Sequence, residues 1–227
     1  MTTHPVQPVD LRGVAAALGD AFLPMTPVEQ QLAREIYRTL LTGHAATVAD
    51  LAARLHADPQ RLAASLERWP GLYRDPQQRI TGIWGLALTD MPHRISTATA
   101  TGAVTTYAWC AFDPLFILPL LGATAEVRSE CPVTGEPIRL TVTPARIRDL
   151  SPGSTVVSML MPTGRFDADI RATFCHYVLF LASPQAGRTW TDQHPGTFLL
   201  PVADAFDLAQ QVNQATFPAL TPDDIRP

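Results

Sequence analysis

Two helix-start signals in the first third of the chain constrain its fold most strongly. Thr26-Pro27-Val28-Glu29 combines an N-cap threonine, a proline at the first helical position and an acid in the first turn. Asp58-Pro59 repeats the cap and the proline, and Thr47 is placed to cap a helix between the two. The expected helices span residues 26–41, 47–55 and 58–69.

The residues after these helices indicate a change to strands. Residues 72–88 read as two strands around a polar turn, so three short helices and a strand pair predict a winged-helix-like domain over residues 26–90. Residues 1–25 are expected to form an arm or a short helix that packs on it. Residues 91–102, rich in Ser, Thr and Ala, are expected to be a linker or an extended crossing segment.

The remaining residues, 103–227, predict a second domain of mixed strands and capped helices. This order indicates an α+β fold, in which a winged-helix-like helical domain precedes a largely antiparallel sheet with short helices. The expected elements are a strand leading to Cys110, a helix from Asp113, a hairpin of strands 124–130 and 138–143, a helix from Thr143-Pro144 to Leu150, strand 155–161, a short helix 167–173, strand 177–182, strand 197–200 and helix 202–216.

Composition and charge exclude several classes of function. With 46% apolar and 17% charged residues, the 227-residue chain can bury a sizeable core. Its net charge is −4, and all its basic residues are arginine, so strong electrostatic attachment to nucleic acid or anionic membranes is not expected. The longest apolar run, residues 115–125, is too short to span a bilayer. The opening residues are polar and broken by proline, which favours a cytoplasmic protein over an exported one.

A DNA-binding regulator is the function that a winged helix first suggests. The expected recognition helix, however, carries two arginines against two acids between residues 58 and 68, a net charge of zero. Because DNA binding usually needs a basic face, this helix argues against it, although a winged-helix regulator stays an alternative.

The residues with the most reactive chemistry are two thiols and one carboxylate. Cys110 lies three residues before Asp113, at an expected strand-to-helix corner where Asp113 would be the N-cap and Pro114 the first helical residue. The positive end of the helix macrodipole would favour a thiolate at Cys110. Cys175 supplies a second thiol beside aromatic residues. Together they form a soft-metal trap with a proton source, whereas the purely structural interpretation is a buried cysteine and a helix cap.

The third cysteine is harder to place. Cys131 stands in the turn of the expected 124–143 hairpin, where it is a third ligand or a structural residue. Three cysteines without a Cys-x-x-Cys pair suit neither a disulfide framework nor a four-ligand zinc site. Free thiols in a reducing compartment are the expected state.

The residues around these groups resemble a known family. Tyr107-Ala108-Trp109-Cys110-Ala111-Phe112-Asp113, followed about sixty residues later by Phe174-Cys175, is similar to the organomercurial (alkylmercury) lyases. The likeness extends over most of residues 26–218. It implies a bacterial cytosolic enzyme that cleaves carbon–mercury bonds and releases a hydrocarbon and Hg(II).

The resemblance also implies roles for individual residues. Cys110 and Cys175 would bind mercury and Asp113 would move the proton, while Cys131 matches a structural family cysteine. His176 departs from the pattern, because many members have a second cysteine there. Apart from the resemblance, the residues expected to line the pocket are Trp109, Phe112, Phe174 and His176, and the apolar setting of the first three would raise the pKa of Asp113.

The expected cofactors and partners follow from the same resemblance. No tightly bound cofactor is expected. Small cytosolic thiols would draw off the Hg(II) product, and mercuric reductase would receive it. A non-catalytic protein that sequesters or senses soft metals would use the same two thiols but need no proton donor, so Asp113 distinguishes the two functions. The preference for alkyl or aryl mercury, the oligomeric state and the role of His176 stay open.

Overall fold

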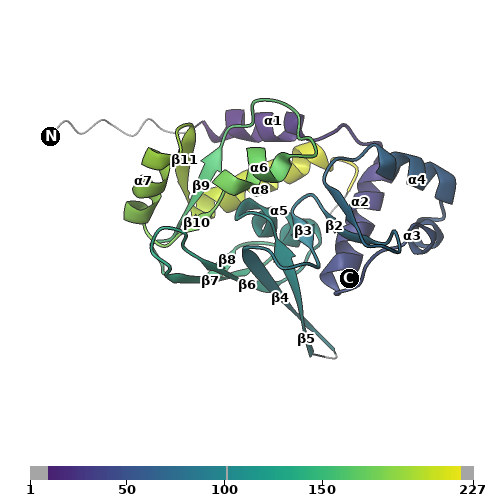
Figure 1. Cartoon of the computed structure of the whole chain (residues 1–227), viewed down its shortest axis with the longest axis horizontal. Coiled ribbons are helices and arrows are strands. Elements are labelled where there is room, and N and C mark those ends of the chain that lie inside the picture. Colours follow the sequence, from purple (N-terminus) through teal and green to yellow (C-terminus); the bar gives the residue numbers. More distant parts are fainter. Residues whose placement is uncertain (1–9, 101, 221–227) are drawn as a thin grey trace.

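The chain forms one large and one small antiparallel sheet, with helices at both ends of the molecule (Figure 1). The computed structural model describes residues 10–100 and 102–220, so residues 1–9 of the expected arm lie outside the described residues. The helices are α1 (Leu11–Ala21), α2 (Pro27–Leu41), α3 (Val48–Leu55), α4 (Pro59–Glu67), α5 (Phe112–Leu120), α6 (Ile170–Thr173), α7 (Pro184–Gln193) and α8 (Val202–Thr216). The strands are β1 (Leu72–Arg74), β2 (Ile80–Ile83), β3 (Leu86–Ala87), β4 (His93–Thr99), β5 (Gly102–Ala108), β6 (Ala125–Glu130), β7 (Pro137–Val142), β8 (Ile147–Ser151), β9 (Val156–Leu160), β10 (Phe180–Leu181) and β11 (Thr197–Pro201).

The two sheets have simple topologies. The larger runs in the order β1-β2-β3-β5-β4-β6-β7-β8 and the smaller in the order β10-β9-β11. All strand pairs between named strands are antiparallel. This confirms the α+β class with a largely antiparallel sheet.

The N-terminal helices begin where their capping residues predict. Thr26 and Glu29 form a complete capping box, in which the Glu29 N–H donates to Thr26 Oγ1 and the Thr26 N–H donates to Glu29 Oε2. The side chain of Thr47 accepts from the backbone of Asp50, and that of Asp58 accepts from the backbone of Gln60. Helix α4 ends at Glu67, slightly earlier than expected, whereas α1 confirms the short helix expected near the N-terminus.

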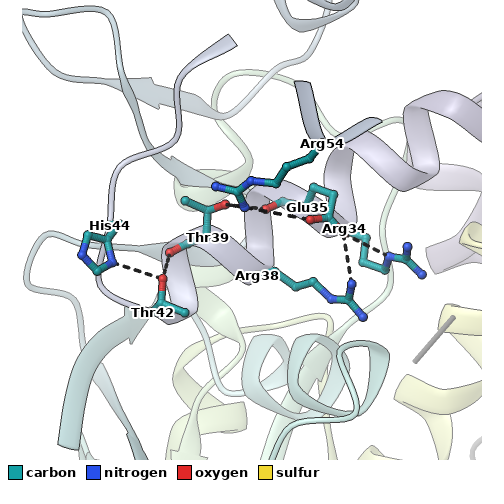
Figure 2. A network of polar contacts seen from close by, with 7 residues as sticks. All are labelled: Arg34, Glu35, Arg38, Thr39, Thr42, His44 and Arg54. Carbon is teal, nitrogen blue, oxygen red and sulfur yellow. Dashed lines mark hydrogen bonds and ion pairs between the residues drawn. The ribbon is translucent and has the colours of Figure 1, made fainter. Parts of the chain in front are cut away.

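A polar network joins α2 to α3 (Figure 2). Glu35 in α2 accepts a hydrogen bond from Arg38 at 3.1 Å, and Arg54 of α3 approaches its other carboxylate oxygen at 4.0 Å. Arg54 also donates to Thr39 Oγ1 at 2.9 Å. Because the side chain of Glu35 is only 13% exposed, these contacts keep a partly buried charge paired.

The strand pair β1–β2 does not pack with the N-terminal helices alone. Strand β2 pairs with β3, and β3 pairs with β5, so both strands are part of the eight-stranded sheet. Residues 91–102 contain β4, an extended segment that lies between β5 and β6. The winged-helix assignment of residues 26–90 and the proposed domain boundaries therefore stay predictions.

Two expected elements were wrong. Residues 143–150 form no helix, because the Thr143 hydroxyl accepts from the backbone of Arg146 and closes a tight turn that leads into β8. The strand expected from Tyr177 is much shorter, because Cys175–Tyr177 form a turn of 3-10 helix before β10. Helix α7, capped by Ser183, was not expected.

Helix α5 lies at the centre of the core. Eight of its nine residues are buried, and Asp113 is the exception. Helix α8 packs on it, and Asn213 Nδ2 donates to the carbonyl of Phe116 at 2.9 Å. Within residues 10–100 and 102–220, no helix combines the length and apolar character needed to cross a bilayer.

Candidate active site

Cys110 is held between two backbone hydrogen bonds in the short loop that joins β5 to α5. The preceding N–H, of Trp109, donates to the carbonyl of Gly85 at 3.0 Å. The following N–H, of Ala111, donates to the carbonyl of Val178 at 2.9 Å. Cys110 is completely buried, as the apolar residues that lead to it predicted. Its position is thus fixed by two segments distant in the sequence.

Asp113 is not the helix cap that its sequence context predicts. Ala111 occupies the N-cap position of α5, and Asp113 lies in the first turn. Its side chain turns back, and Asp113 Oδ2 accepts a hydrogen bond of 2.6 Å from the backbone N–H of Cys110. This bond places the carboxylate directly beside the thiol.

Cys175 completes the group from the opposite side. It begins the 3-10 turn after α6, and its side chain is 4% exposed. The two thiol sulfurs and one carboxylate oxygen of Cys110, Asp113 and Cys175 all lie within 4.8 Å of one another. The three residues expected to act together are therefore brought together, and their donor set suits a soft cation.

Burial controls the protonation of this group. It raises the pKa of Asp113 to about 7, even though backbone N–H groups of Cys110 and Trp109 favour the charged form. Burial also raises the pKa of Cys110 well above its usual range, and Cys175 and the negative charge of Asp113 raise it further. The expected lowering by the helix macrodipole was wrong, because burial and an acidic neighbour outweigh it. Both effects favour a protonated Cys110 thiol at neutral pH.

Sequence reasoning missed the residues that make room for Asp113. Gly85 has a φ of +101°, and a Cβ atom built there would lie 2.3 Å from Asp113 Cγ. The carbonyl of the preceding residue, Trp84, accepts a hydrogen bond of 2.9 Å from the buried hydroxyl of Tyr37 in α2. The turn between β2 and β3 thus approaches Asp113 closely and is held by α2. Its only sequence signal is a glycine between two short apolar strands.

A small apolar cavity lies against Asp113 and Cys175. Its volume is about 20 Å³, and aromatic rings form most of its wall. Phe22 contacts Phe116, Phe166 and Trp84, with ring centroids 5.2 to 6.2 Å apart. Phe112 and Phe174 line it as expected. The complete lining is Leu18, Phe22, Trp84, Gly85, Phe112, Asp113, Phe116, Phe166, Ile170, Phe174 and Cys175.

A second space, an open groove of about 760 Å³, also borders Cys175. Trp109 and His176 line this groove and not the apolar cavity, which differs from the expected position of Trp109 beside Asp113. The complete lining is Pro92, His93, Trp109, Glu130, Pro132, Arg171, Ala172, Cys175, His176 and Leu179. Cys175 is the only described residue that borders both spaces.

Comparison with known proteins identifies the family. A family model described as alkylmercury lyase matches residues 86–214. An alkylmercury lyase of Streptomyces lividans is 36% identical over 83% of this chain and 85% of its own length. The chain belongs to the alkylmercury lyase family. An alkylmercury lyase of Pseudomonas putida is 38% identical over 78% of this chain and 80% of its own length.

A solved structure shares the fold of this alkylmercury lyase family member. The crystal structure of the mercury-bound form of MerB2 covers 91% of this chain and 98% of its own, with a TM-score of 0.70 and 22% identity. The shared architecture therefore extends beyond residues 86–214 to most of the N-terminal helices.

Cys131, the remaining cysteine of this family member, lies outside the group of three. Its thiol is completely buried, and its backbone closes the turn between β6 and β7 by bonds to Glu136 and Gly135. Burial raises its pKa, but hydrogen bonds from Ala182 and Thr134 outweigh this effect and the net pKa is lowered. Among the described residues, the clustered metal-binding groups do not include Cys131, which agrees with a structural role.

Proposed function

We propose that this protein cleaves carbon–mercury bonds by protonolysis, releasing a hydrocarbon and Hg(II). The observation that carries the proposal is the convergence of two thiols and one carboxylate of raised pKa within 4.8 Å. Membership of the alkylmercury lyase family supports it, because relatives of that name match most of the chain.

Mercury is the substrate for which this donor set is suited. A soft cation prefers thiolate over carboxylate or amine ligands, so Cys175 and Cys110 bind the metal and Asp113 does not compete for it. As Cys110 binds mercury, its proton passes to Asp113, whose carboxylate already accepts from the Cys110 backbone at 2.6 Å. The two sulfurs increase the electron density on the organic carbon.

The carbon then takes the proton from Asp113. A carboxylic acid with a pKa near 7 is present in both forms at neutral pH, so it accepts the thiol proton and returns it. The carbon–mercury bond breaks, a carbon–hydrogen bond forms, and mercury stays on the two sulfurs. Asp113 is again a carboxylate, and the proton of the Cys175 thiol leaves with the anion that Cys175 displaced from mercury, so atoms and charges balance over the cycle.

The organic group of the substrate occupies the apolar cavity. Asp113 lines that cavity, so a carbon bound to mercury between the two sulfurs lies on this side to receive the proton. Because engineered cavities of about 150 Å³ hold a benzene ring, a cavity of about 20 Å³ must widen to admit a phenyl group. Small thiols then remove Hg(II), and transfer to mercuric reductase follows as the final step. These reactions belong in the cytoplasm.

The deciding experiment compares wild-type protein with Asp113→Asn. An asparagine side-chain oxygen accepts the same Cys110 N–H bond but carries no transferable proton, so the fold is retained and turnover falls by about 10²- to 10⁴-fold. Purified protein is incubated anaerobically with phenylmercury and excess thiol, and benzene and bound mercury are measured. Cys110→Ser and Cys175→Ser each abolish benzene release.

The same experiment separates the enzyme from a thiol trap. Tight mercury binding without benzene in the wild-type protein would indicate a non-catalytic soft-metal binder. If Asp113→Asn released benzene at the wild-type rate, the carboxylate would have no part in the mechanism. If Cys175→Ser kept full activity, the two-thiol step would be excluded.

A further inference from the structure

The groove beside Cys175 has the chemistry of a second binding site, distinct from the apolar cavity. Its rim carries Arg171 and Glu130, both exposed, and neither forms an ion pair with any described residue. Because Arg171 and Glu130 are not paired with each other, both charges are available to a ligand that carries a negative and a positive group. This contrasts with Arg79 and Asp75, which pair with each other at 2.7 Å elsewhere on the surface.

The walls of the groove also hold polar atoms without partners. His93 is 1% exposed and Trp109 is 3% exposed, and both line the groove. His93 Nδ1 is hydrogen-bonded to Ser129 Oγ at 2.8 Å, whereas His93 Nε2 and Trp109 Nε1 have no hydrogen-bond partner in the described structure. Both nitrogens are inaccessible to solvent, so they lie behind the wall of the groove, and the exposed charges of Arg171 and Glu130 are the polar groups that a ligand in the groove can contact.

The position of Cys175 explains why such a ligand would bind here. The organic group and its proton donor occupy the cavity on one side, and Cys110 lines neither space. A third thiol that approaches mercury therefore reaches it along the groove, at Cys175. The groove serves the step in which one sulfur replaces another on mercury, and not the step that breaks the carbon bond.

We propose that this groove is the docking site for a small zwitterionic thiol, whose carboxylate binds Arg171 and whose ammonium binds Glu130. The inference rests on the proposed function, because it assigns the partner of the same site. The substrate enters as an organomercurial that is bound to a small thiolate. The Cys175 thiolate attacks mercury, a mercury–sulfur bond to Cys175 forms, the mercury–sulfur bond to the small thiolate breaks, and the small thiolate leaves. After the hydrocarbon has left, two small thiolates bind Hg(II) and release the thiolates of Cys175 and Cys110.

The test measures mercury transfer without any carbon–mercury cleavage. Full-length protein is loaded with one equivalent of HgCl2, and the rate of mercury loss is measured after addition of one thiol. The probes are L-cysteine, which carries both charges, 3-mercaptopropionate, which carries only the carboxylate, cysteamine, which carries only the ammonium, and 2-mercaptoethanol, which carries neither. The ratio of variant to wild-type rate for each thiol cancels the intrinsic reactivity of that thiol.

Two variants and one matched control give the expected pattern. Arg171→Gln slows transfer to cysteine and 3-mercaptopropionate about five- to tenfold and changes the other two by less than about twofold. Glu130→Gln slows transfer to cysteine and cysteamine by a similar factor and spares 3-mercaptopropionate. Arg148→Gln, an exposed arginine of β8 that lines neither space, changes none of the four rates.

Equal slowing of all four thiols, or no slowing of any, would overturn the docking site. Charge-dependent transfer in a protein that never releases benzene from phenylmercury would overturn the proposed function and leave the docking site standing. Protein that retains no mercury at all would overturn both. The four thiols therefore separate the two proposals.

Discussion

The carboxyl group of Asp113 occupies the space that a side chain on Gly85 would fill. A Cβ atom at Gly85 would lie 2.3 Å from both Asp113 Cγ and Oδ1, and the backbone of Gly85 has a φ of +101°. Two parts of the chain that are far from each other in sequence therefore meet at the carboxyl group of Asp113. In the proposed mechanism, this contact makes Gly85 a positioning residue for Asp113.

Gly85→Ala is expected to reduce turnover far more than stability alone would explain. The added methyl group displaces Asp113, and misplacement of a catalytic group by about 1 Å can cost ~100-fold in rate. Strain at a positive φ adds about 1–3 kcal/mol to the cost of folding. Steady-state benzene release and urea unfolding measure the two effects. Gly135→Ala is the control, because Gly135 has a φ of +70° but, apart from its chain neighbours, no atom of the described residues lies within 4 Å of the position that its Cβ would take. Equal activity losses in both variants would contradict the positioning role.

The stability of the protein is expected to fall as pH rises from about 4 to 7. Burial raises the pKa of Asp113 from 3.8 to about 7, so within this window the folded protein retains a proton that the unfolded chain has released. Each pKa unit corresponds to about 1.4 kcal/mol, so ionising Asp113 costs roughly 4 kcal/mol. Urea unfolding at several pH values measures the slope, which Asp113→Asn should remove. An unchanged slope in the variant would assign it to other groups.

Cys131→Ser is expected to keep its activity and lose some stability. Cys131 is completely buried and lies outside the group of Cys110, Asp113 and Cys175, while nearby N–H groups can donate to a serine oxygen. We expect cleavage within about twofold of wild type and a loss of about 1 kcal/mol in unfolding free energy. Thermal unfolding and benzene release are the measurements. A loss of cleavage as complete as that of Cys175→Ser would show that Cys131 takes part in the chemistry.

Phe166→Ala is expected to shift the preference of the enzyme towards aryl substrates. Phe166 packs against Phe22 and Phe174 at centroid distances of 5.2 and 5.1 Å, so its removal enlarges the small cavity beside Asp113. The ratio of kcat/KM for phenylmercury to that for methylmercury should rise severalfold. Phe198→Ala in β11, which lines neither space, is the matched control. A ratio that stays unchanged would place the organic group elsewhere.

The sequence predicted well those features that depend on neighbouring residues. The caps at Thr26, Thr47 and Asp58 set the starts of α2, α3 and α4, because capping requires only a side chain and the next few N–H groups. The two thiols and Asp113 were found because soft-metal chemistry needs unusual residue types. Their proximity follows from a fold that brings the turn after α6 against the start of α5.

Features that depend on distant residues could not be predicted in this way. Thr143 has the same sequence signature as the true caps, yet it closes a hairpin because β8 gains backbone partners on β7. The macrodipole argument for Cys110 failed because complete burial, which only the fold shows, raises its pKa, and Cys175 and Asp113 raise it further. Gly85 and Tyr37 bear no chemical signal, and only packing shows that they shape the site.

The continuity of the large sheet restricts how this protein could have been assembled in evolution. Strand β3 pairs with β5, and the turn before it supplies the contact with Asp113, while α2 holds that turn through Tyr37. The N-terminal third is therefore not an independent unit that could be replaced without affecting the site. A chimaera that takes this segment from a relative should keep the order of the strands in the sheet. It should lose proton transfer unless the β2–β3 turn and Asp113, the residue that this turn contacts, come from the same parent.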